Sequence, residues 1–588
     1  MAGTPSKGRH KPRRKGRSSD DDFQLNKSEV LYRAPSFPLA AFMWPARGSA
    51  SQWEVLPLQL MVVGLFKWAA GLWGYSGFEK PPIYGDYEAQ RHWMEITTRL
   101  PVSQWYFYDL QWWGLDYPPL TAYHSWLCGK IGSLIDPSWF ELDTSRGNHN
   151  PNLKIFMRAT VVVSEFLIFV PAIVMFVRRY CRLNAVSNWS ASVALLAVLM
   201  QPATILIDNV HFQYNTVMLG FVAGSMACMV AGRYFWASVF FVAALGFKQM
   251  ALFYALPVFA FLAGSCIFPR INVPRFLSIA LGTLLAFAVL VLPLIAGALY
   301  DQSRGVLAIP DLEGKEVHLP IFPWIEDYVD KSAIYWPVVR LLVQMVHRVF
   351  PVARGLFEDK VANFWCALNV VIKLKQYPSE LLQKASLAAT LAFSALPNLI
   401  LFFKPKKELL PHAFAATAWA FFLFGFQVHE KSVLLPLLPM SLLLAGNNGL
   451  GKETRQWVGF ATILGCWTMF PLLQRVDLRV PYFTLTLLWA YLLGLPPTTL
   501  SAYFPGTQSF TQWLTFLIHI VFYLVMAGWH VVEAFLPPPE DKPDLWTVAN
   551  VGVGAAGFGL CYLWCFYRLL MESKIIPRKW VSKKNKTE

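Results

Sequence analysis

The chain has 588 residues, of which 55% are hydrophobic and only 15% are charged, and its mean hydropathy is +0.40. Soluble domains carry charge on about a quarter of their residues, so this composition excludes an ordinary soluble enzyme. The formal net charge of +15 is spread unevenly along the chain and gathers at its two ends.

Residues 1–50 are predicted to be a basic and largely disordered tail. Its charge places it in the cytosol by the positive-inside rule, and the basic tail over 571–588 is placed there for the same reason. A basic arm is also typical of nucleic-acid binding. Beside so much membrane, a tail near anionic lipid is favoured instead. The first apolar run starts after residue 50, so we expect no cleavable signal peptide.

Residues 51–570 are predicted to form a single all-α polytopic membrane domain with about 14 transmembrane helices. Spans in lipid must satisfy their backbone polar groups internally, and the alternating ten-residue strands of a barrel are missing from the sequence. The segment 235–266 is long enough for two spans. The candidate spans cover residues 54–75, 118–135, 155–177, 190–207, 214–231, 235–266, 275–297, 361–374, 385–403, 411–428, 432–446, 456–473, 481–497, 512–530 and 547–567.

The loop over 76–117 follows the first span and is therefore predicted to be lumenal. It mixes carboxylates with aromatic rings, a pattern that suits sugar chemistry because rings stack on pyranose faces and a carboxylate can take a hydroxyl proton. The alternative is an interfacial aromatic belt with a solvated acidic face. Residues 89–101 also space apolar side chains at helical intervals, which predicts an amphipathic helix on the membrane surface. The loop residues singled out are Asp86, Trp93, Asp116 and Tyr117.

The charge pattern and the span count disagree after the third candidate span. The pair Arg178–Arg179 is typical of a cytosolic segment, yet counting from the first span makes it lumenal. Either an early span is misassigned or the charge rule fails there.

Two polar clusters follow along the chain. HFQYN, from His211 to Asn215, ends an apolar run just after Asp208, where polar groups either line a cavity or cap a helix at the membrane surface. Lys248 lies between two apolar stretches. It is suited to binding a phosphate as a point charge, or alternatively to snorkelling toward the interface.

A second large loop covers 298–360 and ends in VVRLLVQMVHRVF. Val339, Leu342, Val343 and Val346 share one face of a helix there, which predicts simple packing.

A third cluster, His429, Glu430 and Lys431, interrupts an apolar stretch. Three adjacent ionisable groups are costly in lipid unless they face water or a ligand. His429 and Lys431 together suit a phosphate, whereas helix-end polarity is the structural alternative. The spacing is not the HExxH of a zinc protease.

Six segments together resemble one enzyme family. The chain is similar to the endoplasmic-reticulum glucosyltransferases that use dolichyl-phosphate glucose and have the GT-C fold. The segments occur in the order of that family from residue 85 to 439, and the first two resemble the branch that adds the first glucose to the nine-mannose lipid-linked oligosaccharide. They read GDYEAQRHWMEIT, LDYPPLTAYHS, DNVHFQYN, FKQMALFYA, RGLFEDKVANFWC and VHEKSVLLPLLP.

The resemblance implies a donor, an acceptor and a stereochemical course. The donor is dolichyl phosphate β-D-glucose, and the acceptor is the terminal A-arm mannose of a dolichyl-pyrophosphate-linked glycan. The α-1,3 product bond implies inversion, which is a single displacement that needs one base. A phosphate monoester leaves as an anion without a general acid. No DxD motif occurs in the lumenal loops, so we expect neither a metal nor another cofactor.

The resemblance also assigns roles to residues. Asp86 matches the base, and Asp116 is expected to support the site or orient the acceptor. His429 and Lys431, with Glu430 between them, match the segment assigned to the donor phosphate, and Lys248 and His211 are further candidates for substrate binding. Trp93 and Tyr117 are the aromatic candidates for contacts with a sugar.

The expected location is the endoplasmic-reticulum membrane, with the site facing the lumen and both termini in the cytosol. Lys584 and Lys586 match a dilysine retrieval signal, which works only on a cytosolic tail. Three alternatives stay open: the sister branch that adds the second glucose, a polytopic transporter, and an inactive scaffold subunit. A transporter would show repeated halves around a midplane site, which the sequence does not display.

Overall fold

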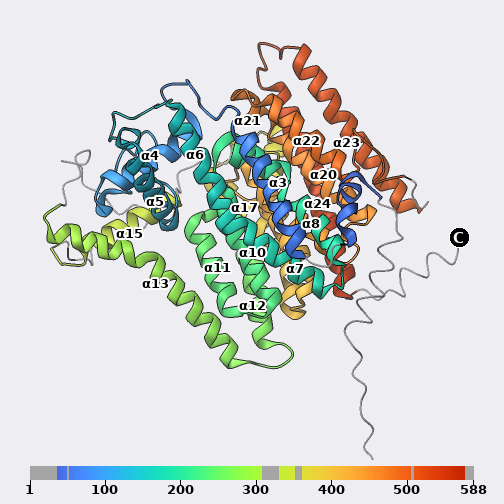
Figure 1. Ribbon diagram of the computed structural model, residues 1–588, viewed down its shortest axis with the longest axis horizontal. Helices are drawn as coiled ribbons and strands as arrows, with labels where there is room; N and C mark the ends of the chain where they lie inside the picture. Colours follow the sequence, from blue (N-terminus) through green and yellow to red (C-terminus); the bar gives the residue numbers. More distant parts are fainter. Residues whose placement is uncertain are drawn as a thin grey trace, which may run out of the picture.

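The computed structural model describes residues 36–48, 52–306, 330, 332–350, 360–504 and 509–575. Within these ranges the chain consists of helices and connecting loops without a strand (Figure 1). This confirms the predicted all-α class. Most of the two basic tails and much of the loop over 298–360 lie outside the described ranges.

In that part of the chain, nine helical segments are long and apolar enough to cross a membrane. Two shorter apolar helices, α10 (Asn215–Ala231) and α11 (Tyr234–Phe247), accompany them. The segment 235–266 is divided into α11 and α12 (Ala255–Ile267), as its length allowed. The total of about 14 spans stays a prediction. The nine segments are Glu54–Gly71 (within α3, Gln52–Gly71), Pro151–Leu183 (α6, Pro151–Ser164, and α7, Val170–Leu183), Asn188–Phe212 (α8, Asn188–Leu199, α9, Pro202–Thr204, and a π-helix, Ile205–Phe212), Gln249–Ile267 (with α12), Val273–Ser303 (α13), Ser379–Phe403 (α17), Lys452–Arg475 (α20, Lys452–Thr468, and α21, Phe470–Arg475), Phe510–Phe535 (α23) and Leu545–Ser573 (α24).

The remaining helices are shorter and lie between these segments. Among them, α16 spans eight residues, which at 1.5 Å per residue is about 12 Å. The candidate span at 361–374 is therefore wrong, because this helix is too short to cross a membrane. The remaining helices are α2 (Pro38–Phe42), α4 (Gly85–Arg99), α5 (Pro119–Ile135), α15 (Trp336–Val349), α16 (Phe364–Val371), α18 (Leu410–Phe424), α19 (Leu434–Leu442) and α22 (Arg479–Leu493).

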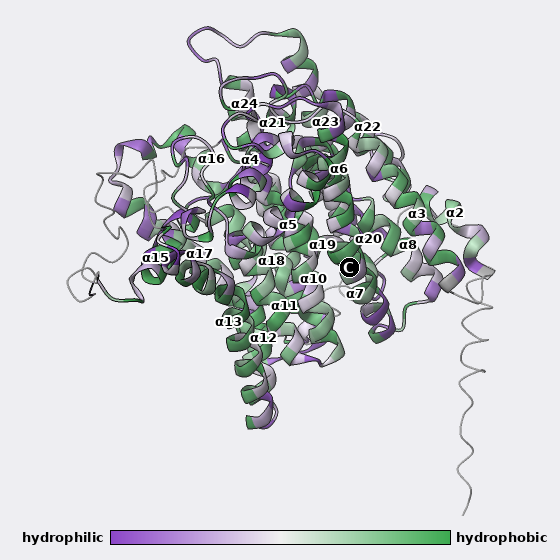
Figure 2. Cartoon of the chain, turned by 60° about the vertical axis from the view of Figure 1, so that its left-hand side comes forward, coloured by the Kyte–Doolittle hydropathy of each residue, from purple (hydrophilic) through white to green (hydrophobic). Residues whose placement is uncertain are grey.

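The outer helices present apolar side chains outward. Figure 2 shows hydrophobic residues along α12 and α13, whereas hydrophilic residues gather around α4 and α15. On α13, the large side chains of Leu284, Val289 and Leu292 are exposed. Such a surface would be costly in water and is typical of a helix that faces lipid.

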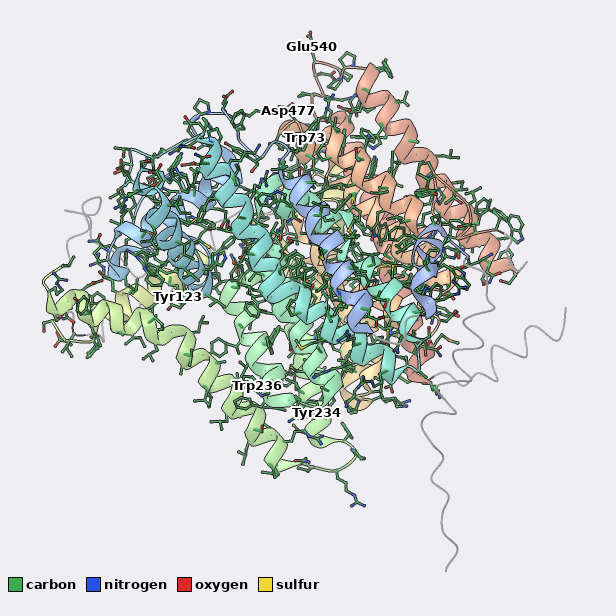
Figure 3. All side chains as sticks on the ribbon, viewed as in Figure 1. Trp73, Tyr123, Tyr234, Trp236, Asp477 and Glu540 are labelled. Carbon is green, nitrogen blue, oxygen red and sulfur yellow. The ribbon has the colours of Figure 1, made fainter. Side chains whose placement is uncertain are left out.

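The bundle has two distinct ends. Figure 3 places Trp73 and Asp477 at one end and Tyr234 and Trp236 at the other. We call the first the Trp73 end. The chain leaves α3 there, and Lys80 fixes the following loop by donating to the carbonyl of Arg475 at 2.6 Å.

The chain stays at the Trp73 end between α3 and α6. α5 packs along α4 beside the bundle (Figure 1), and Arg99 of α4 donates to the carbonyl of Phe140 at 2.8 Å just after α5 ends. Lys154 of α6 then donates to the carbonyl of Leu72 at 3.1 Å. The predicted span at 118–135 is therefore wrong, because this apolar helix packs on protein without crossing the bundle.

This correction removes the conflict at Arg178–Arg179. Since α5 does not cross, the chain enters α6 at the Trp73 end and leaves α7 at the opposite end. The arginine pair therefore lies at the end where α3 begins, as the charge pattern indicated.

The second large loop contacts the first through α15. Gln344 donates to the carbonyl of Tyr106 at 3.1 Å, and Arg348 donates to the carbonyl of Gly114 at 3.0 Å. The apolar contacts are made by Leu341, Leu342 and Met345, together with Val338. Of the face predicted from the sequence only Leu342 belongs to this contact, so the packing face is rotated from the predicted one.

Candidate active site

Asp86 lies in the first turn of α4, immediately after a sharp change of chain direction. Tyr84 has φ 58° and Gly85 has φ 68°, both in the left-handed region. At Gly77 (φ 79°), a Cβ atom would lie 1.8 Å from the carbonyl oxygen of Tyr84, so only glycine fits this close approach. The turn places the carboxylate of Asp86 at the positive end of the α4 dipole, which favours the ionised form.

Three side chains from distant segments converge on Oδ2 of Asp86. Gln213 Nε2 donates to it at 2.9 Å, His211 Nδ1 lies 3.5 Å away, and Lys431 Nζ forms an ion pair with it. The Asp86 side chain is 21% exposed, so it is accessible from solvent. The contacts that the described residues make with this carboxylate all fall on one of its two oxygens.

Competing effects set the pKa of Asp86. Burial raises the pKa most strongly, but the charge of Lys431 and the neighbouring His211, with hydrogen bonds from Lys431 and Gln213, together outweigh burial. The net result is a pKa well below the usual range for aspartate. Asp86 is therefore ionised at neutral pH.

A second ammonium group is connected to the Asp86–Lys431 pair through Gln213. The buried ammonium of Lys248 donates to Gln213 Oε1 and to Asn215 Oδ1, both at 2.9 Å. Asn215 donates in turn to Asp208 at 2.9 Å. Gln213 thus bridges Asp86 and Lys248, and charges of opposite sign alternate along the chain of contacts. Snorkelling of Lys248 is wrong, because its side chain is enclosed.

Asp208 also fulfils the capping alternative for its segment. Its carboxylate accepts from the backbone N–H and the hydroxyl of Thr216 in the first turn of α10, at 2.5 and 2.7 Å. The same segment therefore caps α10 and places His211 and Gln213 beside Asp86.

The two aromatic candidates lie near Lys248. The ammonium lies 4.6 Å from the ring centroid of Tyr117, and that ring meets Trp93 edge-on at 4.9 Å. Asp116 is half-buried just before α5 and lies within electrostatic reach of Lys248. Of these three residues, Tyr117 contacts the second ammonium group, Trp93 packs against Tyr117, and Asp116 acts on Lys248 through its charge.

His429 and Glu430 have a different arrangement from Lys431. His429 caps a short 3-10 helix (Glu430–Val433) by accepting from the backbone N–H of Lys431 at 3.3 Å. Its Nδ1 lies 3.2 Å from Glu430, and its side chain is 37% exposed. The capping alternative thus holds for His429, while the same turn directs Lys431 to Asp86.

The solvated acidic face expected of an interfacial belt is wrong for α4. Glu88 and Glu95 are buried and both bind the guanidinium of Arg91, which also donates to Ser145 at 2.6 Å. The polar side of α4 is covered by the loop after α5, so this helix does not lie on the membrane with its polar face in solvent.

Gln213 belongs to the predicted HFQYN cluster but was not named individually as a site residue. Its neighbours His211 and Asp208 drew attention because they are ionisable, whereas a neutral amide gives a weaker signal. Among the described residues, no group of three or more His, Cys, Asp or Glu side chains could hold a metal ion.

The fold and this cluster define a class: a multi-pass helical membrane protein with a carboxylate and two ammonium groups gathered at one end of the bundle. The model of the family described as "ALG6, ALG8 glycosyltransferase family" matches residues 58–308 and 328–567 of this chain. The chain belongs to this family.

Individual relatives agree over nearly full length. A protein of Schizosaccharomyces pombe, named probable dolichyl pyrophosphate Man9GlcNAc2 alpha-1,3-glucosyltransferase, is 42% identical over 92% of this chain and 96% of its own. The dolichyl pyrophosphate Man9GlcNAc2 alpha-1,3-glucosyltransferase of Saccharomyces cerevisiae is 39% identical over 92% and 95%, and its namesake in Gallus gallus is 34% identical over 89% and 98%.

Proposed function

We propose that this protein transfers glucose from dolichyl phosphate β-D-glucose to the terminal A-arm mannose of the dolichyl-pyrophosphate-linked nine-mannose oligosaccharide, forming an α-1,3 bond with inversion. The observation that carries the proposal is the ionised, accessible carboxylate of Asp86, paired with Lys431. The names of the relatives, which specify a Man9GlcNAc2 alpha-1,3-glucosyltransferase, support this acceptor and linkage.

The proposed step is one in-line displacement. The mannose hydroxyl oxygen bonds to C1 of glucose while the bond from C1 to the phosphate oxygen breaks, and the electron pair leaves with dolichyl phosphate. The hydroxyl proton passes to Asp86. Because the contacts of the described residues fall on Oδ2, we assign Oδ1 to the proton.

The cations supply the complementary charge. A donor phosphate brings negative charge to the site, and ammonium groups bind phosphate as point charges. Lys431 is the partly exposed cation of the cluster, so we assign it to the donor phosphate, with His429 beside it. Lys248 is fully enclosed, and its assigned role is to orient Gln213 against Asp86.

The test is glucose transfer in detergent from a synthetic dolichyl-phosphate glucose analogue to a nine-mannose acceptor lipid. Asp86→Asn is expected to lower turnover by at least about 10²-fold while donor binding is largely kept, because the amide cannot accept the proton. Asp143→Asn is the matched control, since Asp143 follows α5 at the same end of the bundle and its side chain is 55% exposed. Full activity of Asp86→Asn would remove the assignment of the base.

The same assay separates the two branches of the family. Offering an acceptor that already carries one glucose beside the unglucosylated acceptor is expected to give product only from the latter. Preference for the glucosylated acceptor would assign the chain to the branch that adds the second glucose.

We further propose that the protein resides in the endoplasmic-reticulum membrane with the Trp73 end in the lumen. The position of Arg178–Arg179 at the opposite end supports this orientation, because basic residues favour the cytosolic side. A cysteine introduced for Glu540, which Figure 3 places at the outer edge of the Trp73 end, is expected to resist an impermeant thiol reagent in sealed microsomes. Labelling without detergent would mean that the Trp73 end faces the cytosol instead.

A further inference from the structure

Two charged side chains form a pair inside the membrane-spanning part of the bundle, away from the contacts of Asp86. Lys67 of α3 lies 3.0 Å from Oε1 of Glu165, and both side chains are 0% exposed. Glu165 begins a π-helical turn, Glu165–Phe169, between α6 and α7. Charged residues within spans are costly and commonly mark functional sites, yet the proposed displacement uses neither residue.

The second oxygen of Glu165 connects this pair to the polar segment of the site. Oε2 accepts from Nδ2 of Asn209 at 3.1 Å. Asn209 lies in the π-helix Ile205–Phe212, which also contains His211. The pair therefore holds a side chain two residues from a contact of Asp86.

A buried arginine holds the backbone of the same turn. Arg158 of α6 donates to the carbonyl of Asn209 at 2.6 Å and to that of Val210 at 2.7 Å. A π-helical turn is wider than an α-helical one and leaves its carbonyls less regularly paired, and such turns are frequent at functional sites. Arg158 thus holds two carbonyls of the wide turn, and Glu165, seven residues further along the same helical segment, holds the side chain of Asn209.

The geometry of this turn directs two side chains at the base. Phe212 has φ 90°, so the chain reverses between His211 and Gln213. Both neighbours of Phe212 then face Oδ2 of Asp86, at 3.5 Å and 2.9 Å. Phe212 is not glycine, and a conformation of this kind persists only where the surroundings enforce it.

We propose that Lys67 and Glu165 are positioning residues for glucose transfer: through Asn209 they hold the π-helical turn that directs His211 and Gln213 to Asp86. This inference rests on the proposed function. Glu165 acts through the carboxylate oxygen that accepts a hydrogen bond from Asn209. Lys67 balances the charge of Glu165.

Two double variants separate positioning from simple packing. Replacing a buried ion pair as a whole is usually tolerated, whereas removing one partner leaves an uncompensated charge. Lys67→Met with Glu165→Gln removes both charges but keeps a carbonyl oxygen for Asn209. Lys67→Met with Glu165→Leu removes both charges and that acceptor, so the two variants differ in the one contact under test.

The expected result is a difference in kcat between two folded proteins. The glutamine double variant is expected to turn over close to the wild-type rate, while the leucine double variant loses about 10²-fold in kcat, as small misplacements of catalytic groups do. KM for both substrates should change little. Thermal unfolding followed by intrinsic fluorescence checks folding. If the leucine variant does not fold, Asn209→Leu tests the same contact from its other end and is expected to lower kcat likewise.

Equal kcat in the two double variants, or wild-type kcat in Asn209→Leu, would overturn this inference alone. An inactive wild-type protein would overturn the proposed function and this inference with it. The wild-type measurement therefore distinguishes the two failures.

Discussion

Replacing Lys431 by methionine tests the electrostatic arrangement at the base. With the ammonium present, the pKa of Asp86 lies well below its usual range even though burial raises it. Two unit charges about 4 Å apart interact by about 4 kcal/mol at an effective dielectric constant near 20, equivalent to about three pKa units. Without Lys431, burial is opposed only by the smaller effects of His211 and Gln213, so the pKa of Asp86 should rise by a comparable amount.

The measurement is kcat/KM for glucose transfer as a function of pH, since this ratio reports groups of the free enzyme. As the proposed base, Asp86 takes the proton only when it is ionised, so a higher pKa means that activity is lost at a higher pH as acid is added. Lys431→Met is expected to move this acidic limb upward by about three pH units. Under the proposed assignment of Lys431 to the donor phosphate, the height of the profile also falls, but the position of the limb does not depend on its height.

Lys431→Arg is the matched control, because it keeps the positive charge and should leave the acidic limb at low pH. Acidic limbs at the same pH in the methionine and arginine variants would refute the reasoning, since Lys431 would then have no effect on the protonation of the base.

Two further predictions concern the histidines. His429→Ala should weaken binding of the donor more than that of the acceptor, because His429 is partly exposed beside Lys431; an unchanged donor titration would contradict the assignment. Burial lowers the pKa of His92 and Arg91 opposes its charge, but the carboxylates of Asp109 and Glu95, each 3.2 Å from a ring nitrogen, outweigh both effects and raise the pKa. The resulting stability is present below the unfolded pKa of about 6.5 and is lost as pH rises through the folded pKa. Wild-type Tm should thus fall with rising pH in that window, whereas Tm of His92→Gln should be flat there.

Most residues of the cluster around Asp86 could be predicted from the sequence, because ionisable side chains in so apolar a chain have few places to lie. His211, Lys248 and Lys431 each interrupt an apolar stretch, and the structure brings all three together at the Trp73 end with Asp86. Their roles in transfer stay predictions. Gln213 was included only within the HFQYN cluster, because its orientation toward Asp86 depends on the backbone at Phe212, where φ is 90°, and the sequence does not reveal that conformation.

The errors in the fold have a common physical origin. An apolar run of span-like length predicts burial but does not specify whether lipid or protein covers it. α5 packs one face on α4, while apolar side chains such as Leu127 and Leu134 on its other side are exposed. The polar side of α4 was expected in solvent for a similar reason. Its covering partner, Ser145, lies 54 residues beyond Arg91 in the chain, outside any window that a helical period can reveal.

The hydrogen bonds between α15 and the first loop affect which substitutions this loop tolerates. Gln344 and Arg348 hold main-chain oxygens, and every residue type supplies such an oxygen. A substitution in the segment from Tyr106 to Gly114 therefore does not by itself remove these two hydrogen bonds. Gly114 is the exception, because a Cβ atom there would lie 2.9 Å from the backbone Cα of Leu110, as well as 3.1 Å from the guanidinium of Arg348. We therefore expect the glycine, the two donors and the buried side chains of Phe107 and Tyr108 to be kept, whereas the exposed side chains of this segment can vary.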